Sequence, residues 1–114
     1  MTRTSYNNGA LVASVIKRLI KDPDLKAVFI YNTDYEYMSS ILPAIADHLE
    51  NDVLTYAYQR KEIRTPVGDG NIRFVNSVEK TCGSMYNIVY LSALADLKPH
   101  DVQYLNNSCY DSNK

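Results

Sequence analysis

Two short apolar runs constrain the fold of this 114-residue chain more than any other feature. Residues 26–31 read KAVFIY and residues 87–91 read NIVYL, and each is continuously apolar after its first residue. Strands that are apolar on both faces are typical of parallel sheets covered by helices. The chain is long enough for one such domain and too short for two.

Amphipathic helices are predicted on either side of the first strand. Apolar residues repeat at helical spacing over residues 9–21 and again from about residue 33 to about residue 50. Pro23 predicts the end of the first helix, because a proline disfavours helical geometry in the residue before it. Thr33 and Glu36 predict a capping box at the start of the second helix. Pro43 predicts a kink or a break within it.

The second half of the chain reads as three further strands, a short turn and a last helix. VLTYAY at 53–58 predicts a strand, and residues 61–77 predict a hairpin around PVGDG, where Asp69 and its neighbours tolerate a positive φ. SVEKTC predicts a short helix or turn, and Pro99 predicts a last helix through residue 105.

The predicted fold class is therefore α/β, with a three-layer, mostly parallel sheet, flanking helices and an edge β-hairpin. The expected organisation is a flexible N-terminus (1–8), a single α/β domain (9–107) and a polar tail (108–114).

Charge and cysteine content exclude several classes of function. The net charge is -1, from 12 basic and 13 acidic residues, so any charged partner must meet a local patch. No apolar run is long enough to span a membrane, and no secretory leader is visible. Cys82 and Cys109 lack a metal-binding spacing, and a disulfide between them stays open. We expect a cytoplasmic protein with no metal and no cofactor.

Three segments of the chain carry a resemblance in pattern and spacing. They read NNGALVASVIKRLIKDPDLKAVFIY, NTDYEYMSSILPAIADHL and EIRTPVGDGNIRFVNSVEKTCGSMYNIVYLSALADL. In this order they resemble part of the RecA-like ATPase core of large terminases and nucleic-acid helicases. The third segment is closest, since that family has there a hairpin, a turn that ends in Gly and an apolar strand. The same order of elements also arises in unrelated small α/β domains.

The chain departs from that family where the ATPase chemistry resides. A P-loop requires GxxxxGK[ST], and SYNNGALVA offers Gly9 without the Lys or the hydroxyl residue. Ser92 and Ala93 stand where the family has the carboxylates that organise magnesium and water. Cys82 stands where the family often has Arg. These departures predict a protein that neither binds ATP tightly nor hydrolyses it.

Two surface segments are candidate binding sites. Basic residues alternate with aromatic ones near the predicted hairpin, an arrangement that can hold phosphates and stack bases; they are Arg60, Lys61, Arg64, Arg73, Tyr56 and Tyr58. Asp34, Tyr35, Glu36 and Tyr37 form an acidic, Tyr-containing helix start that suits a basic partner protein. Either segment can equally be an ordinary solvated face.

These observations predict a small, non-catalytic binding protein. The resemblance implies a viral or mobile-element accessory factor or inhibitor that acts on a larger nucleic-acid-processing machine through protein contact, in the host cytoplasm if viral. Self-association is a further expectation, because sheet edges left uncovered favour it. The alternative is a nucleic-acid-binding module that uses the basic hairpin at 60–73.

Overall fold

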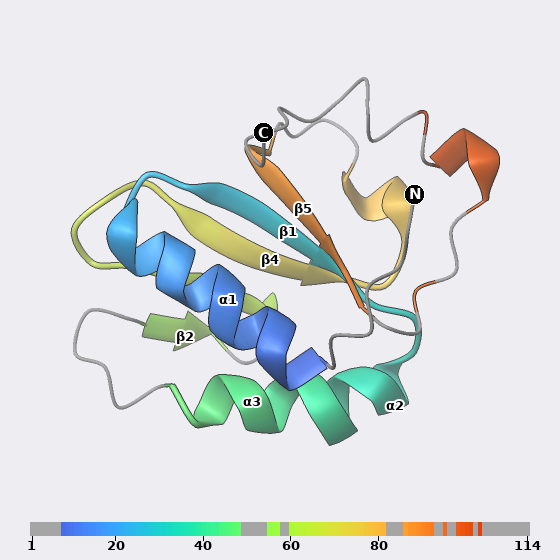
Figure 1. Ribbon diagram of the computed structural model, residues 1–114, viewed down its shortest axis with the longest axis horizontal. Helices are drawn as coiled ribbons and strands as arrows, with labels where there is room; N and C mark the ends of the chain where they lie inside the picture. Colours follow the sequence, from blue (N-terminus) through green and yellow to red (C-terminus); the bar gives the residue numbers. More distant parts are fainter. Residues whose placement is uncertain are drawn as a thin grey trace.

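A five-stranded mixed sheet forms the centre of the computed structural model, with the strand order β2-β3-β4-β1-β5 (Figure 1). The structure describes residues 8–48, 55–57, 60–81, 86–92, 95, 98–101 and 103. β1 (Lys26–Ile30) lies between β4 (Asn71–Val75) and β5 (Ile88–Leu91) and runs parallel to both. The prediction that the apolar run at 26–31 forms a central, parallel strand is confirmed.

The other half of the sheet is antiparallel, which corrects the expectation of a mostly parallel sheet. β2 (Thr55–Ala57) pairs with β3 (Glu62–Arg64), and β3 pairs with β4, both in antiparallel fashion. The predicted hairpin is present, but its second strand is not at an edge, because β4 also pairs with β1. The two edge strands are β2 and β5, and three of the four residues of β5 are only half-buried.

The hairpin turn lies against the loop that follows α1 (Asn8–Lys21). The Gly70 N–H donates to the Pro23 carbonyl at 2.7 Å, and a Cβ on Gly70 would lie 2.4 Å from that oxygen and 2.5 Å from the Leu25 carbonyl oxygen. Among the described non-glycine residues, only Lys61 has a positive φ. The turn therefore needs glycine for close approach of two backbones, and not for the positive φ that the sequence predicted.

The second helix is one continuous run of three pieces. It consists of α2 (Asp34–Glu36), the π-helical η1 (Tyr37–Ile41) and α3 (Leu42–Ala46), and we call the whole run the α2–α3 helix. Pro43 lacks an N–H and its ring would clash with the carbonyl one turn earlier in a regular helix. The wider π-helical turn directly precedes Pro43, which explains why the predicted break occurs there without ending the helix.

Both helices cover the same face of the sheet (Figure 1). The larger core lies between them and this face. Its members are Val12, Val15, Ile16, Leu19, Leu25, Ala27, Phe29, Tyr31, Tyr37, Ile41, Ile45, Ile63, Ile72, Phe74 and Ile88. A smaller cluster on the opposite face contains Val28, Ile30, Val75, Tyr86 and also Val78, which belongs to the 3-10 helix η3 (Val78–Thr81). The second face is thus covered, in the described residues, by a short helical turn.

The ends of the domain differ in part from the expected boundaries. Asn8 was expected in the flexible N-terminus, but it is the first residue of α1 and is 7% exposed. Residues 99–101 and 103 are helical, as Pro99 predicts. Tyr58, Cys82, Ala93, Cys109 and the tail at 108–114 lie outside the described residues. Among the described helices, none combines the length and apolar character that crossing a membrane requires.

Candidate functional site

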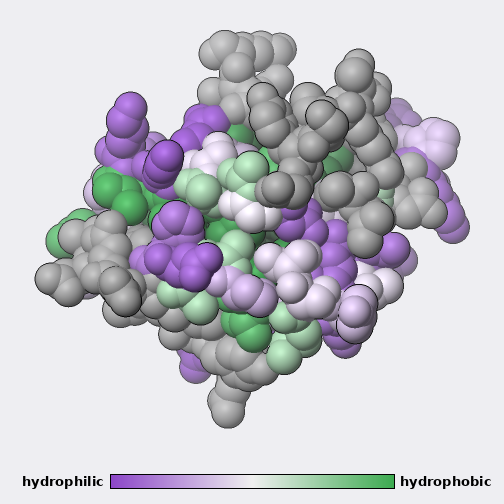
Figure 2. Space-filling model, turned by 60° about the horizontal axis from the view of Figure 1, so that its bottom comes forward, coloured by the Kyte–Doolittle hydropathy of each residue, from purple (hydrophilic) through white to green (hydrophobic). Residues whose placement is uncertain are grey.

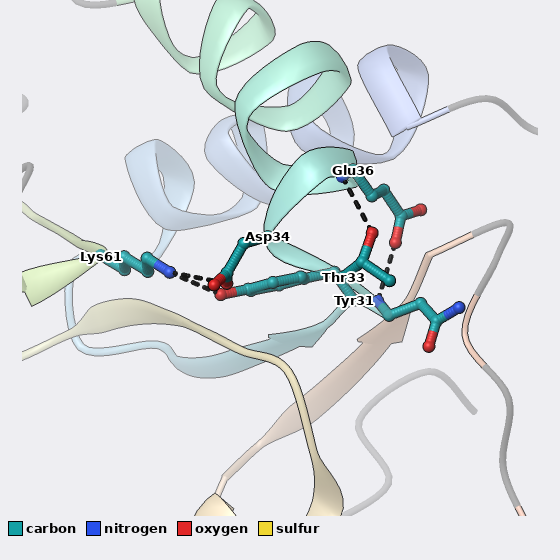
Figure 3. Close-up of polar contacts among 6 residues, drawn as sticks. Tyr31, Thr33, Asp34, Glu36 and Lys61 are labelled. Atoms are coloured by element: carbon teal, nitrogen blue, oxygen red, sulfur yellow. Dashed lines mark hydrogen bonds and ion pairs between the residues drawn. The ribbon is translucent and has the colours of Figure 1, made fainter.

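The start of the α2–α3 helix is fixed by a side-chain cap. The Thr33 hydroxyl accepts a hydrogen bond from the Glu36 N–H at 3.1 Å, as the sequence predicts. In a capping box the Glu36 carboxylate would accept from the N–H of the cap residue Thr33. Here it accepts instead from the N–H of the preceding residue, Asn32, at 2.7 Å (Figure 3). The cap therefore places Glu36 directly beyond the carboxyl end of β1.

Glu36 is a buried carboxylate, only 3% exposed, held by neutral donors from three separate elements. Besides the Asn32 N–H, its Oε1 accepts from the Ser92 hydroxyl at 3.1 Å. Its Oε2 accepts from the Asn8 side-chain amide at 2.8 Å, and that amide also donates to Ser40. The three donors tie together the start of α1 and the carboxyl ends of β1 and β5. The strand end that carries Ser92 thus faces a carboxylate from the α2–α3 helix.

Lys61 joins the hairpin to the same helix start from the other side (Figure 3). Its Nζ donates to the Tyr31 hydroxyl at 2.8 Å, forms an ion pair with Asp34 at 3.4 Å and lies 4.8 Å from the Tyr37 ring centroid. The Tyr31 hydrogen bond is the main cause that raises the pKa of Lys61, with Asp34 adding to it and burial opposing it. Lys61 therefore remains a cation that stabilises the fold between two aromatic rings.

The solvent-facing side of the α2–α3 helix carries no charged residue between Glu36 and Asp47. Its exposed residues follow helical spacing, and we call them the outer helix face: Tyr35, Met38, Ser39, Pro43 and Ala46. Tyr35 is 81% exposed and Met38 is 49% exposed. Figure 2, which brings the lower side of Figure 1 forward, shows pale green, white and lilac atoms here, flanked by purple hydrophilic groups. A surface helix ordinarily carries charges at such positions.

The structure separates the four residues predicted for protein binding. Asp34 and Tyr35 are exposed at the start of the outer helix face. Glu36 and Tyr37 are buried, at 3% and 1% exposure, because the capping geometry turns them toward the sheet. Their side chains stabilise the interior and do not form part of a contact surface. The sequence did not identify Met38, Pro43 and Ala46, although the ten uncharged residues from 37 to 46 were a visible signal.

The predicted basic hairpin does not form one continuous cationic surface. Lys61 is directed to Tyr31 and Asp34, whereas Arg64 and Arg73 project from the opposite face of the sheet, since Ile63 and Ile72 fill the helix-covered face. Arg64 pairs with Glu62, and hydrogen bonding to that carboxylate is the main cause that raises the pKa of Arg64. Arg73 donates to the Tyr86 hydroxyl at 2.7 Å.

The remaining predicted residues of that patch add little to it. Arg60 is exposed, Tyr56 lies in β2 and the side chain of Tyr58 is outside the described residues.

Within the part of the chain that the structure describes, no group of three or more His, Cys, Asp or Glu side chains could hold a metal ion. His48 follows the end of α3 half-buried, and His100 is exposed beside Asp101.

Comparison of the chain with protein-family models, with curated proteins and with solved structures finds no match in any of the three. The function must therefore be argued from the geometry of the chain itself.

Proposed function

We propose that this chain is a non-catalytic binding protein that contacts a partner protein through the outer helix face. The observation that carries the proposal is the ten-residue helical stretch at 37–46, which has no charge although Met38, Ser39, Pro43 and Ala46 face outward. Aromatic residues and Met are enriched at protein interfaces, and charged residues are depleted at their centres. Tyr35 and Met38, three residues apart, provide the two largest side chains for such a contact.

The charges at the two ends of this face indicate the chemistry of the partner. Asp34 and Asp47 are exposed at its start and its end. A second copy that met this face through a two-fold axis, with antiparallel helices, would bring these acidic ends together. A different protein, with an apolar contact area bordered by basic side chains, is the better complement.

A matched pair of substitutions tests the contact. Met38→Glu introduces a charge into the outer helix face, and Val67→Glu introduces the same charge at a position in the hairpin turn that is 72% exposed. Each immobilised variant is used for affinity capture from native lysate, followed by mass spectrometry. We expect a protein that binds the unmodified chain and Val67→Glu but not Met38→Glu. Equal capture by both variants, or recovery of nucleic acid alone, contradicts the proposal. Thermal melts establish that both variants fold.

The alternative function, binding of nucleic acid by the hairpin at 60–73, receives less support from the geometry. Lys61, Arg64 and Arg73 each have an intramolecular partner, and they are divided between two faces of the sheet. The alternative predicts an affinity that falls steeply with salt concentration and is weakened by combining Arg64→Ala with Arg73→Ala. Unchanged affinity in that double variant eliminates this surface.

The wider biological setting is part of the proposal and rests on the pattern resemblance alone. That resemblance suggests a viral or mobile-element accessory factor or inhibitor in the cytoplasm, with a nucleic-acid-processing machine as its partner. The RecA-like relationship belongs to the same proposal. Calorimetric titration with ATP tests it, because a micromolar dissociation constant would contradict a core that has lost its P-loop Lys and Asp-Glu pair.

A further inference from the structure

The carboxyl ends of β1 and β4 lie side by side, and the connections that follow them leave on opposite faces of the sheet. From β1 the chain crosses the helix-covered face through the α2–α3 helix and reaches β2 at one side of the sheet. From β4 it passes through η3 on the opposite face and reaches β5 at the other side. In open α/β sheets, ligands bind beyond the carboxyl ends of the parallel strands.

A pocket of about 270 Å³ occupies this position. Residues that follow β1 and β4 form one side of it, among them Asn32, Asn76 and Ser77. The segment at 98–101, which begins the last helix, forms another side. The pocket volume lies just below the range of about 300–1,000 Å³ that is typical of small-molecule sites. The pocket thus lies beyond the carboxyl ends of two adjacent parallel strands.

The polar groups of the pocket include side chains that the fold itself does not use. Within the described part of the chain, the side chains of Asn76 and Ser77 make no hydrogen bond, although both are half-buried. Half-buried amides and hydroxyls are stabilised by a partner, and a ligand or water in the pocket can supply one. Apolar side chains also line the pocket, namely the buried Ile30, Val78 and Ala95.

The described charges around the pocket do not sum to a positive charge. Lys98 contributes one positive charge, and Glu79 and Asp101 contribute one negative charge each. Asp101 accepts from the Lys98 N–H at 3.2 Å and lies 3.3 Å from the His100 Nε2. A multiply charged anion such as a phosphate therefore meets no net positive field. Amide and hydroxyl side chains both donate and accept hydrogen bonds, as the hydroxyl groups of a ligand do.

We propose that this pocket binds a small, uncharged, hydroxyl-rich ligand of the size of one sugar ring. Asn32, Asn76 and Ser77 exchange hydrogen bonds with its hydroxyl groups, and the Glu79 carboxylate accepts from them. Its C–H groups pack on the apolar side chains of the pocket. This site is separate from the outer helix face. The ligand proposal therefore does not depend on the protein contact proposed above.

Heteronuclear NMR titration of the full chain tests the site, with D-ribose, D-glucose and D-galactose as neutral probes and inorganic phosphate as the anionic probe. We expect saturable shifts of the backbone amides of residues 76, 77, 98, 100 and 101 with at least one sugar, and none with phosphate. A ring of about a dozen non-hydrogen atoms implies a dissociation constant on the order of 1 mM. Failure of all three sugars to give saturable shifts overturns the proposal, and so does saturable binding of phosphate at these amides.

Two variants and a control assign the binding to these side chains. Asn76→Ala and Ser77→Ala each remove one hydrogen-bonding group and should weaken the sugar about three- to tenfold. Ser39→Ala, on the outer helix face, serves as the control and should leave the affinity unchanged. Unaltered amide shifts outside the pocket show that each variant is folded. Equal affinity in all three variants overturns the assignment.

Discussion

The buried carboxylate of Glu36 provides the sharpest test of how this fold is held together. Glu36→Gln keeps the shape of the side chain and removes its charge. The Gln oxygen can still accept from the Asn32 N–H and the Ser92 hydroxyl, which now bond a neutral acceptor. The Gln amide nitrogen then faces the Asn8 amide nitrogen, which donates to Oε2 at 2.8 Å in the native chain. One of the three contacts is thereby changed from attractive to repulsive.

The size of the effect follows from these three contacts. A hydrogen bond to a charged group contributes about 1.5–3 kcal/mol and a neutral one about 1 kcal/mol, so two weakened bonds lose about 1 kcal/mol each. The mismatched third contact costs about 1–3 kcal/mol. Relief of the cost of burying a charge offsets part of the loss. We expect a net destabilisation of about 2 kcal/mol, or a decrease of about 8 °C in Tm for a chain of this length.

Urea denaturation of two single variants, their combination and a control measures this effect. Asn8→Asp alone places two carboxylates in contact in the interior and should also destabilise the fold. Combining Asn8→Asp with Glu36→Gln exchanges amide and carboxylate, restores a donor opposite an acceptor, and should give a favourable coupling free energy of at least about 1 kcal/mol. Asp47→Asn, at an exposed position, should change stability by less than about 0.5 kcal/mol. A Glu36→Gln loss no larger than this control, or no coupling, refutes the reasoning.

Three further predictions concern the loop and turns around β3. The hydrogen bond from Lys61 to Tyr31 raises the pKa of Lys61 above the ordinary value of 10.5. The contribution of the charged Lys61 to the stability of the fold is therefore complete below pH 10.5 and is lost as the pH rises through the raised pKa. Above pH 10.5 the free energy of unfolding should therefore fall more steeply with pH for the native chain than for Lys61→Met. Equal pH dependence in the two proteins would contradict this. Gly70→Ala should cost at least about 2 kcal/mol in urea denaturation, whereas Asp69→Ala in the same turn should cost less than about 0.5 kcal/mol. Thr65→Val should raise the free energy of unfolding by about 1 kcal/mol, since the buried Thr65 hydroxyl has no hydrogen-bond partner in the described residues; a decrease would reveal one.

The elements that the sequence predicts well are those specified by local pattern. The apolar run at 26–31 indicated a buried central strand, Thr33 indicated a helix cap and the Gly-rich turn indicated a hairpin, and all three are present. Local pattern does not reveal which strands become neighbours. The position of β4 beside β1 depends on contacts 45 residues apart, from Lys26 to Asn71, so its place inside the sheet was not predicted.

The candidate site was predicted in part for the same reason. Tyr35 was identified from composition, but Glu36 and Tyr37 were placed on the surface because the polar character of a side chain suggested exposure. The burial of Glu36 depends on donors from Asn8 and Ser92, which are 28 and 56 residues away along the chain. The burial of Tyr37 depends on ring contacts with Tyr31 and with the distant Phe74. Lys61 was likewise assigned to a nucleic-acid surface, since its partners on β1 and at the helix start are distant in sequence.

The central position of β1 also affects how the protein is made. A ribosome completes this strand first among the five, yet its two neighbours are β4 and β5, which end at Val75 and Leu91. At a synthesis rate of about 5–20 residues per second, the interval from Ile30 to Leu91 lasts about 3–12 s. During that time four consecutive apolar side chains, Ala27–Ile30, await their sheet partners. A chaperone that binds exposed apolar segments of nascent chains would find one there.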